Sequence, residues 1–76
     1  MEINKFLEHF AEQFDDTPKE AFIADTNFRE LEEWDSLSAL SVIAMIDEEY
    51  DIQITGADLR GVTTIKELFD LVVSKN

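Results

Sequence analysis

Residues 35–50 read DSLSALSVIAMIDEEY, and this stretch carries the clearest structural pattern in the chain. Asp35 is a favourable N-cap residue, so the stretch predicts a helix from about Ser36 to Tyr50. At about 100° per residue, several of its large apolar side chains fall within one arc, which predicts a stripe that faces the core. The predicted core-facing residues are Ala39, Val42, Ile43, Ile46 and Tyr50.

The opposite side of this helix is apolar at its start and acidic at its end. It presents Leu37, Leu40 and Ala44, and continues with Asp47 and Glu48. An outward face of this kind indicates a docking site, with apolar contact at one end and charge pairing at the other. The alternative is that the preceding loop folds back and covers the leucines.

A second amphipathic pattern lies at the start of the chain. Its apolar stripe is formed by Ile3, Phe6, Leu7, Phe10 and Phe14. This helix should end near Asp15-Asp16, because Thr17 precedes Pro18 and a residue before proline avoids the α region. Residues 17–34 then form a long connection, of a kind that is often functional. Apolar anchors should pack it against the core, at Phe22, Ile23, Phe28, Leu31 and Trp34.

Two capping patterns follow the central helix and a short extended link over residues 52–56. Thr55 and Asp58 predict a short helix over about 56–60, and Thr64 with Glu67 fits a capping box that starts the last helix. The last helix has its apolar stripe at Ile65, Leu68, Phe69 and Val72. We therefore predict an all-α fold, a single domain over residues 1–76 with three main helices, one short helix and a long first loop.

The composition excludes several kinds of site. There is no cysteine, and His9 is the only histidine, so neither a thiolate nor a multi-histidine metal site is expected. His9 shares a polar flank with Glu12 and Gln13, which favours a surface position over a catalytic one. No apolar stretch reaches the roughly 20 residues of a membrane span, and no secretory signal is visible. We expect a monomer in the cytoplasm that does not insert into membranes.

The charge of the chain is strongly negative and unevenly distributed. Eighteen acidic residues against six basic ones give a net charge of −12. Such a field repels nucleic acid and anionic lipid, and attracts basic patches on proteins. No lysine or arginine lies between Arg29 and Arg60, so we look for function in this middle region. The alternative is that the acidity serves solubility alone.

Ser36 occupies the first position of the predicted central helix. An anion attached to its hydroxyl would meet unpaired backbone amides and the positive end of the helix dipole. Position alone is weak evidence, because serines near helix starts commonly act as caps.

The residues around Ser36 strengthen this interpretation as an ordered set. The helix begins with Asp35-Ser36-Leu37 and ends in the acidic stretch DEEYDIQI, residues 47–54. Before the helix stand DTNF, residues 25–28, and Leu31. After it stands VTTI, residues 62–65. This set closely resembles the acyl carrier protein family, whose hallmark is Asp-Ser-Leu at the head of the second helix. The resemblance covers nearly the whole chain and is strongest over residues 25–72.

The resemblance implies a carrier that is not itself an enzyme. A phosphopantetheinyl transferase would attach a 4'-phosphopantetheine arm from coenzyme A to Ser36, with Asp35 helping to position the Mg²⁺–coenzyme A complex. Partners would be this transferase and acyl-transfer, condensing or ligase enzymes with basic docking patches. The recognition face would be Leu37, Leu40, Ala44, Asp47 and Glu48. An acyl cargo, held as a thioester, would lie partly between the second and third helices, against Ile46, Ile54, Leu59 and Val62.

Two features depart from the commonest fatty-acid carriers. Glu33 stands where that family usually has a glycine, and Ser38 and Ser41 replace acidic residues. The negative potential is therefore displaced toward Glu32-Glu33 and residues 47–49. A specialised carrier for a lipid, polyketide or aminoacyl pathway fits at least as well as a housekeeping fatty-acid carrier. Trp34 is interpreted as a plug between the loop and the core.

Other functional classes fit less well. A serine hydrolase needs a glycine before Asp35, a suitably placed histidine and a longer chain. A calcium sensor needs a loop with glycine, which the acidic stretch 47–51 lacks. An acidic helical adaptor that docks basic proteins without a prosthetic group shares every bulk feature, and only Ser36 distinguishes it from a carrier.

Overall fold

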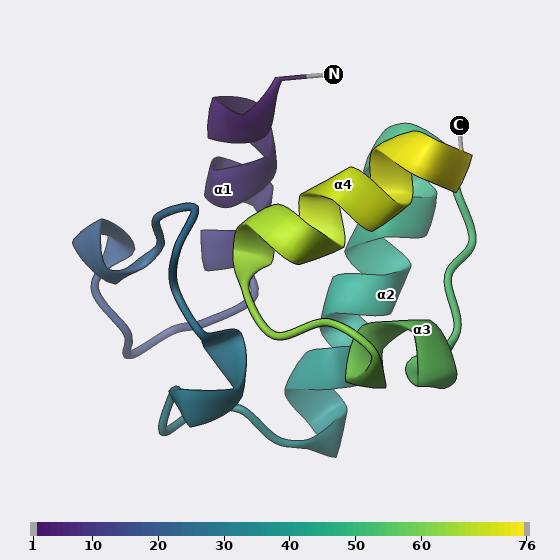
Figure 1. Ribbon diagram of the computed structural model, residues 1–76. Coiled ribbons are helices and arrows are strands. Elements are labelled where there is room, and N and C mark those ends of the chain that lie inside the picture. The colour runs from purple at the N-terminus through teal and green to yellow at the C-terminus, as the bar shows by residue number, and fades with distance from the viewer. Residues whose placement is uncertain (1, 76) are drawn as a thin grey trace.

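The computed structural model describes residues 2–75, and within them the chain is helical with no β-strand. Its α-helices are α1 (Ile3–Ala11), α2 (Ser36–Tyr50), α3 (Gly56–Arg60) and α4 (Ile65–Lys75). The 3-10 helices η1 (Lys19–Ala21) and η2 (Phe28–Glu30) lie between α1 and α2. This confirms the predicted fold of three main helices and one short helix. Figure 1 shows the two termini at one end of the bundle and the start of α2 at the other.

None of these helices is long and apolar enough to cross a bilayer. The longest of them, α2, has 15 residues, whereas a span needs about 20.

The first helix, α1, is shorter than its sequence pattern predicts. The pattern continues to Asp15-Asp16, but the helix ends at Ala11. Beyond Ala11 the amides of Gln13 and Phe14 donate to carbonyls three residues earlier, both at 3.1 Å, so the backbone tightens into 3-10 geometry. Phe14 is buried all the same. The apolar spacing therefore continues after the α-helix has ended, and spacing alone cannot locate that end.

His9 lies beside Glu12 on the predicted polar flank of α1, but it is less exposed than a surface position implies. Its side chain is half-buried, because the end of α2 packs against it. The ring lies edge-on to Tyr50, with the two ring centres 5.9 Å apart. Its nitrogens lie 3.5 Å from a Glu12 oxygen and 3.8 Å from a Glu49 oxygen. His9 thus links α1 to the last turn of α2.

The long connection between α1 and α2 is fastened to the start of α4. Asn27 forms an antiparallel bridge with Thr64, and the Ile65 amide donates to the Thr26 carbonyl at 3.1 Å. Four of its predicted anchors pack against the core: Phe22 and Phe28 are buried, and Leu31 and Trp34 are half-buried. Ile23 is not an anchor, because it lies in a tight turn closed by Thr26 and is 57% exposed.

The core-facing side of α2 agrees with the predicted stripe, with one addition. Val42 and Ile46 are fully buried, and Ala39, Ile43 and Tyr50 are half-buried. Met45 is also buried, so the buried arc is rotated toward Met45 relative to the prediction. The helix stops at Asp51, whose left-handed conformation (φ 56°, ψ 39°) is one that aspartate tolerates better than most residues.

Both predicted capping boxes are present and fix the starts of α3 and α4. Thr55 and Asp58 exchange two side chain–backbone hydrogen bonds of 3.0 Å each. Thr64 and Glu67 exchange a similar pair of 3.0 and 3.1 Å. The hydrogen bonds from the backbone amides lower the pKa of both carboxyl groups. Of the stripe predicted for α4, Ile65, Leu68 and Val72 are fully buried and Phe69 is partly buried.

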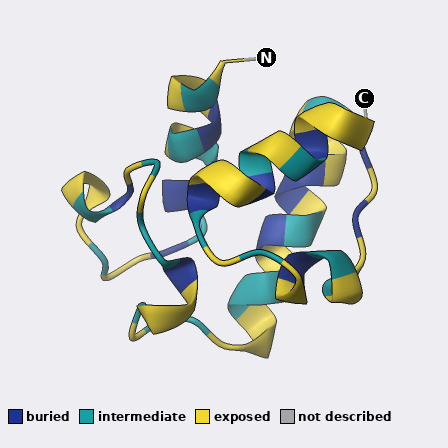
Figure 2. Ribbon diagram, in the orientation of Figure 1, coloured by how far each residue is buried: buried dark blue, intermediate teal, exposed yellow. Residues whose placement is uncertain are grey.

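The core has an aromatic side and an aliphatic side. Phenylalanines of α1 and of the long connection surround Trp34, whose ring centre lies 4.7 Å from that of Phe28 and 6.4 Å from that of Phe10. Trp34 is therefore the predicted plug between the loop and the core. The aliphatic side is formed by buried residues of α2, α3, α4 and the 51–55 link. Figure 2 shows buried positions on both α2 and α4.

Candidate functional site

Ser36 is the first residue of α2 and is exposed. None of the hydrogen bonds found within residues 2–75 uses its hydroxyl. The first amides of an α-helix have no intrahelical acceptor, and here Asp35 caps one of them: its carboxylate accepts from the Ser38 amide at 2.8 Å. This hydrogen bond is the main reason that the pKa of Asp35 lies below its usual value. A charged carboxylate and a free hydroxyl thus stand side by side in the chain.

Glu33 ties the start of α2 to the segment that follows α1. Its carboxylate accepts from the Thr17 hydroxyl and, at 3.2 Å, from the Asp16 amide. The Thr17 hydrogen bond is the largest cause of the lowered pKa of Glu33. The Glu33 carbonyl accepts from the Ser38 hydroxyl at 2.7 Å. The residue that departs from the carrier pattern is therefore used inside the fold, which explains its charge without a docking role.

A hollow of about 430 Å³ opens beside Ser36, within the size range of small-molecule sites. It lies between the first turns of α2, the short helix α3 and the connection before α2. Apolar side chains form part of its wall, and charged side chains stand among them. The lining residues are Arg29, Trp34, Asp35, Ser36, Ala39, Gly56, Leu59 and Arg60.

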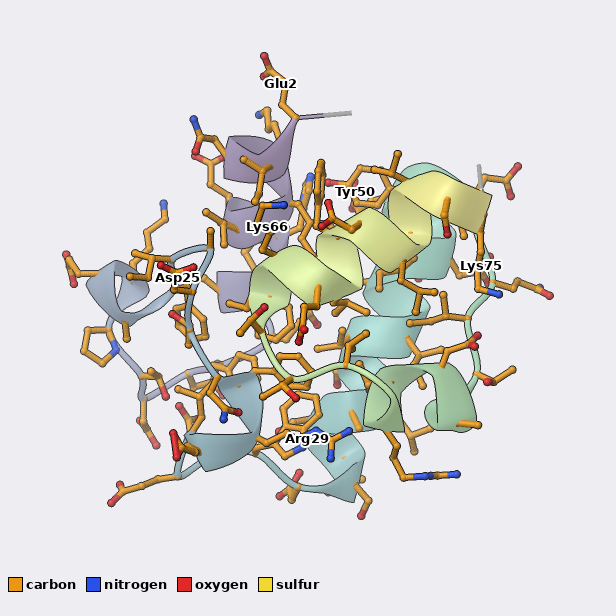
Figure 3. The ribbon with its side chains drawn as sticks, viewed as in Figure 1. Glu2, Asp25, Arg29, Tyr50, Lys66 and Lys75 are labelled. Carbon is orange, nitrogen blue, oxygen red and sulfur yellow. The ribbon has the colours of Figure 1, made fainter. Side chains whose placement is uncertain are left out.

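The two arginines of this hollow are functional candidates that sequence reasoning does not identify. Arg29 reaches across from η2: its guanidinium donates to the Val62 carbonyl at 3.0 Å, to the Leu59 carbonyl at 3.2 Å and to the Arg60 carbonyl (Figure 3). In the sequence, Arg29 and Arg60 bound the stretch without positive charge. That signal marks both residues, but it does not show that they meet at one site.

The predicted recognition face is open to solvent. Leu37 is 73% exposed and Leu40 is 62% exposed, so the preceding loop does not cover them. Ala44, Asp47 and Glu48 are also exposed on the same helix. A second hollow, of about 410 Å³, lies along this part of α2, with Leu40, Ala44 and Asp47 in its lining. The structure therefore brings the five predicted docking residues onto one accessible surface.

The four residues predicted to contact an acyl cargo share one core cluster but not one cavity. Ile46 is fully buried, Ile54 and Leu59 are nearly so, and Val62 is half-buried. Leu59 lines the hollow beside Ser36, whereas Ile54 lines the second hollow. The two hollows follow each other along the side of α2, because one includes Ala39 and the other includes Leu40 and Ile43. Ile46 and Val62 line neither.

The surroundings of Ser36 suit a covalently attached phosphate. Its hydroxyl is exposed and unbonded, so a modifying enzyme can reach it. The unpaired amides of the first helical turn and the positive end of the helix dipole favour an anion at this position. The adjacent hollow adds the positively charged side chains of Arg29 and Arg60.

Comparison with known proteins gives one match. Residues 4–72 match a family model described as a phosphopantetheine attachment site. Searches of curated proteins and of solved structures found no match.

Proposed function

The chain belongs to the phosphopantetheine attachment family of carrier domains, and we propose that Ser36 is the residue that bears its covalent 4'-phosphopantetheine group. The main support is the exposed, unbonded hydroxyl at the first position of α2. Position at a helix start alone would be weak support, but here it coincides with the Asp-Ser-Leu sequence of a matched family.

The chain's own residues contribute exposure and orientation to the attachment reaction. The Ser36 oxygen forms a bond to the phosphorus of the pantetheine phosphate, the pyrophosphate bond of coenzyme A breaks, adenosine 3',5'-bisphosphate leaves, and the hydroxyl proton passes to the transferase or to solvent. Asp35, held by the Ser38 amide, keeps its charge and helps to orient the Mg²⁺–coenzyme A complex. When attached, the group supplies a terminal thiol, which a chain without cysteine lacks.

In this proposal the protein is a carrier and not an enzyme. A flexible tether raises the effective concentration of its cargo at the active site of each partner. The partner enzymes then catalyse the reactions of the cargo, while α2 carries the attachment point and the surface that these enzymes bind.

We place the docking surface on the exposed side of α2, at Leu37, Leu40, Ala44, Asp47 and Glu48. Within residues 2–75, neither Asp47 nor Glu48 forms a salt bridge. Both lie in the last turn of α2, where the helix dipole disfavours negative charge by about 0.3–1 kcal/mol per residue. A charge pattern that costs stability at this position is better explained by binding to basic partners than by folding.

We further propose that the cargo is an acyl or aminoacyl thioester that uses the side of α2 next to α3. Leu59 and Ile54 line the two successive hollows there, over the buried Ile46, and Val62 lies nearby in the same cluster. Because Ser38 and Ser41 replace acids, the upper docking surface is less charged than in the commonest fatty-acid carriers. A carrier for a specialised lipid, polyketide or aminoacyl pathway therefore fits at least as well as a general fatty-acid carrier.

Incubation with coenzyme A, Mg²⁺ and a broad-specificity phosphopantetheinyl transferase tests the attachment site. Intact mass spectrometry should show one phosphopantetheine added to the wild type and none added to Ser36→Ala. Ser41→Ala is the matched control, because Ser41 is an exposed serine of the same helix, and it should be modified like the wild type. An adaptor without a prosthetic group would show no adduct in any form.

A further inference from the structure

Arg29 is held in a fixed orientation by the C-terminal end of α3. Its Nε and Nη2 atoms donate to backbone carbonyls of Leu59, Arg60 and Val62. These hydrogen bonds use one edge of the guanidinium, and within residues 2–75 the Nη1 atom makes none. Arg29 therefore holds a positive charge in a fixed position at the hollow beside Ser36, and the N–H groups of its Nη1 atom remain available as hydrogen-bond donors.

Neither arginine is neutralised, although the protein has a net charge of −12. Within the described part of the chain, Lys5, Lys66 and Lys75 each have a carboxylate partner, whereas Arg29 and Arg60 have none. Within the same range Lys19 also has no carboxylate partner, so the feature that distinguishes the two arginines is that both unpaired guanidinium groups line one hollow. Their charge is available to an anion that enters the hollow.

The Arg60 guanidinium lies close to the start of α3, because a Cβ atom at Gly56 would lie 3.3 Å from its Nη1 atom. Leu59, Ala39 and Trp34 supply apolar wall between the charged groups. The resulting site combines two fork-shaped donors, both exposed at the hollow, and guanidinium groups bind phosphate oxygens through paired hydrogen bonds.

We propose that this hollow binds the phosphodiester end of the 4'-phosphopantetheine group, with Arg29 and Arg60 as its counter-charges. The inference rests on the proposed attachment at Ser36, which lines the same hollow. A phosphodiester there adds a negative charge next to Asp35, and the two arginines offset that repulsion. The attached group is then held at its proximal end, and its remainder is directed along α2 toward the second hollow.

The test compares apo and fully modified forms of the wild type, Arg60→Gln and Lys19→Gln. Arg60 is the better target of the two arginines, because the Arg29 side chain also ties η2 to α3. Lys19 is the matched control: it is exposed, has no salt bridge within residues 2–75 and does not line this hollow. Both substitutions remove one positive charge. Intact mass confirms modification, and the readouts are the melting temperature and the phosphorus-31 NMR signal.

Attachment should raise the melting temperature of the wild type and of Lys19→Gln by about 2–4 °C, as expected for an exposed ion pair in a domain of this size. Arg60→Gln should lose most of this arm-dependent rise, and its phosphorus signal should shift and narrow. In 0.5 M salt the wild-type rise should shrink.

Two results would overturn the inference in distinguishable ways. Complete modification with the same arm-dependent shift and the same phosphorus signal in all three proteins would refute the phosphate site and leave the carrier function intact. Absence of any mass adduct would refute attachment at Ser36, and the phosphate site with it.

Discussion

The first turn of α2 is held by hydrogen bonds and aromatic packing, whereas the last turn packs on α1 through Tyr50 and, within residues 2–75, leaves Asp47 and Glu48 without ionic partners. Glu33 binds the Thr17 hydroxyl just before the helix begins, and Trp34 packs on Phe28 with ring centres 4.7 Å apart. Asp35 then caps the first turn through the Ser38 amide. Ser36, the proposed attachment residue, thus lies in a turn that is fixed by the residues directly before the helix.

The last turn of α2 has a different construction. Within residues 2–75, Asp47 and Glu48 have no ionic partner, and Glu49 lies 3.8 Å from a nitrogen of His9. The chain then turns away at Asp51 in a left-handed conformation. The difference fits the two roles that we propose: the first turn holds Ser36 in a fixed geometry, and the last turn offers unpaired charge to a basic partner.

The largest expected effect comes from removing the aromatic support of the first turn. Phe28→Ala should lower the free energy of unfolding by about 3–5 kcal/mol, because a fully buried ring is replaced by a cavity. Leu40→Ala removes an apolar side chain that is 62% exposed on the same helix, and should change stability by no more than about 0.5 kcal/mol. Chemical denaturation of both variants provides the measurement.

Similar losses in the two variants would contradict the comparison. They would mean that Leu40 is covered in solution and that the exposed side of α2 is part of the core. A small loss in Phe28→Ala alone would show that the connection does not support the start of α2.

The elements of this comparison differ in how well sequence predicts them. Local patterns predict the bounds of α2, its Asp35 cap and the boxes at Thr55 and Thr64, because capping depends on residues three positions apart. The exposed Leu37 and Leu40 are likewise predicted from the helical period. These features involve neighbours along one helix, and a single sequence contains the necessary information.

Contacts between distant segments were not predictable in the same way. The hydrogen bonds from Arg29 to carbonyls of α3 and the bond between Glu33 and Thr17 join residues far apart in the chain. The burial of Met45 depends on where neighbouring helices pack, and the end of α1 depends on a shift to 3-10 geometry that keeps the apolar spacing. The hollow beside Ser36 results from such contacts, so no local sequence pattern predicts that Arg29 and Arg60 line it.

A smaller effect is expected at the last turn of α2. Glu48→Lys should raise the free energy of unfolding by about 0.3–1 kcal/mol, because it places a positive charge at the C-terminal end of the helix dipole. The same change should weaken transferase binding several-fold if this turn docks a basic partner. Glu20→Lys is a control with the same charge change at an exposed position of η1. Denaturation and a binding titration measure the two quantities separately.

A Glu48→Lys variant that is more stable but binds the transferase more weakly would support the docking surface, because its loss of binding could not result from unfolding. If Glu48→Lys and Glu20→Lys weakened transferase binding equally, net charge alone would explain the effect and the docking surface would lie elsewhere.

The smallest expected effect concerns the pH dependence of the first turn. The Thr17 hydroxyl and the Asp16 amide lower the pKa of Glu33 below its ordinary value of 4.5. A group with a lowered pKa in the folded state stabilises the fold fully above its unfolded pKa, and loses that contribution as the pH falls through the folded pKa. Glu33→Gln cannot lose a charge on acidification. Wild type should therefore melt at a higher temperature than Glu33→Gln at pH 7, and the difference should shrink below about pH 4.5.

Melting curves from pH 7 to pH 3 test this sign, with Glu32→Gln as the neighbouring control. Glu32 is exposed and makes no hydrogen bond within residues 2–75, so its variant should follow the wild-type curve. If the difference in melting temperature between wild type and Glu33→Gln stayed constant with pH, the glutamine side chain would replace the charged and the protonated carboxyl group to the same extent. The charge of Glu33 would then not contribute to stability, and the start of α2 would be held by its aromatic contacts and the Asp35 cap.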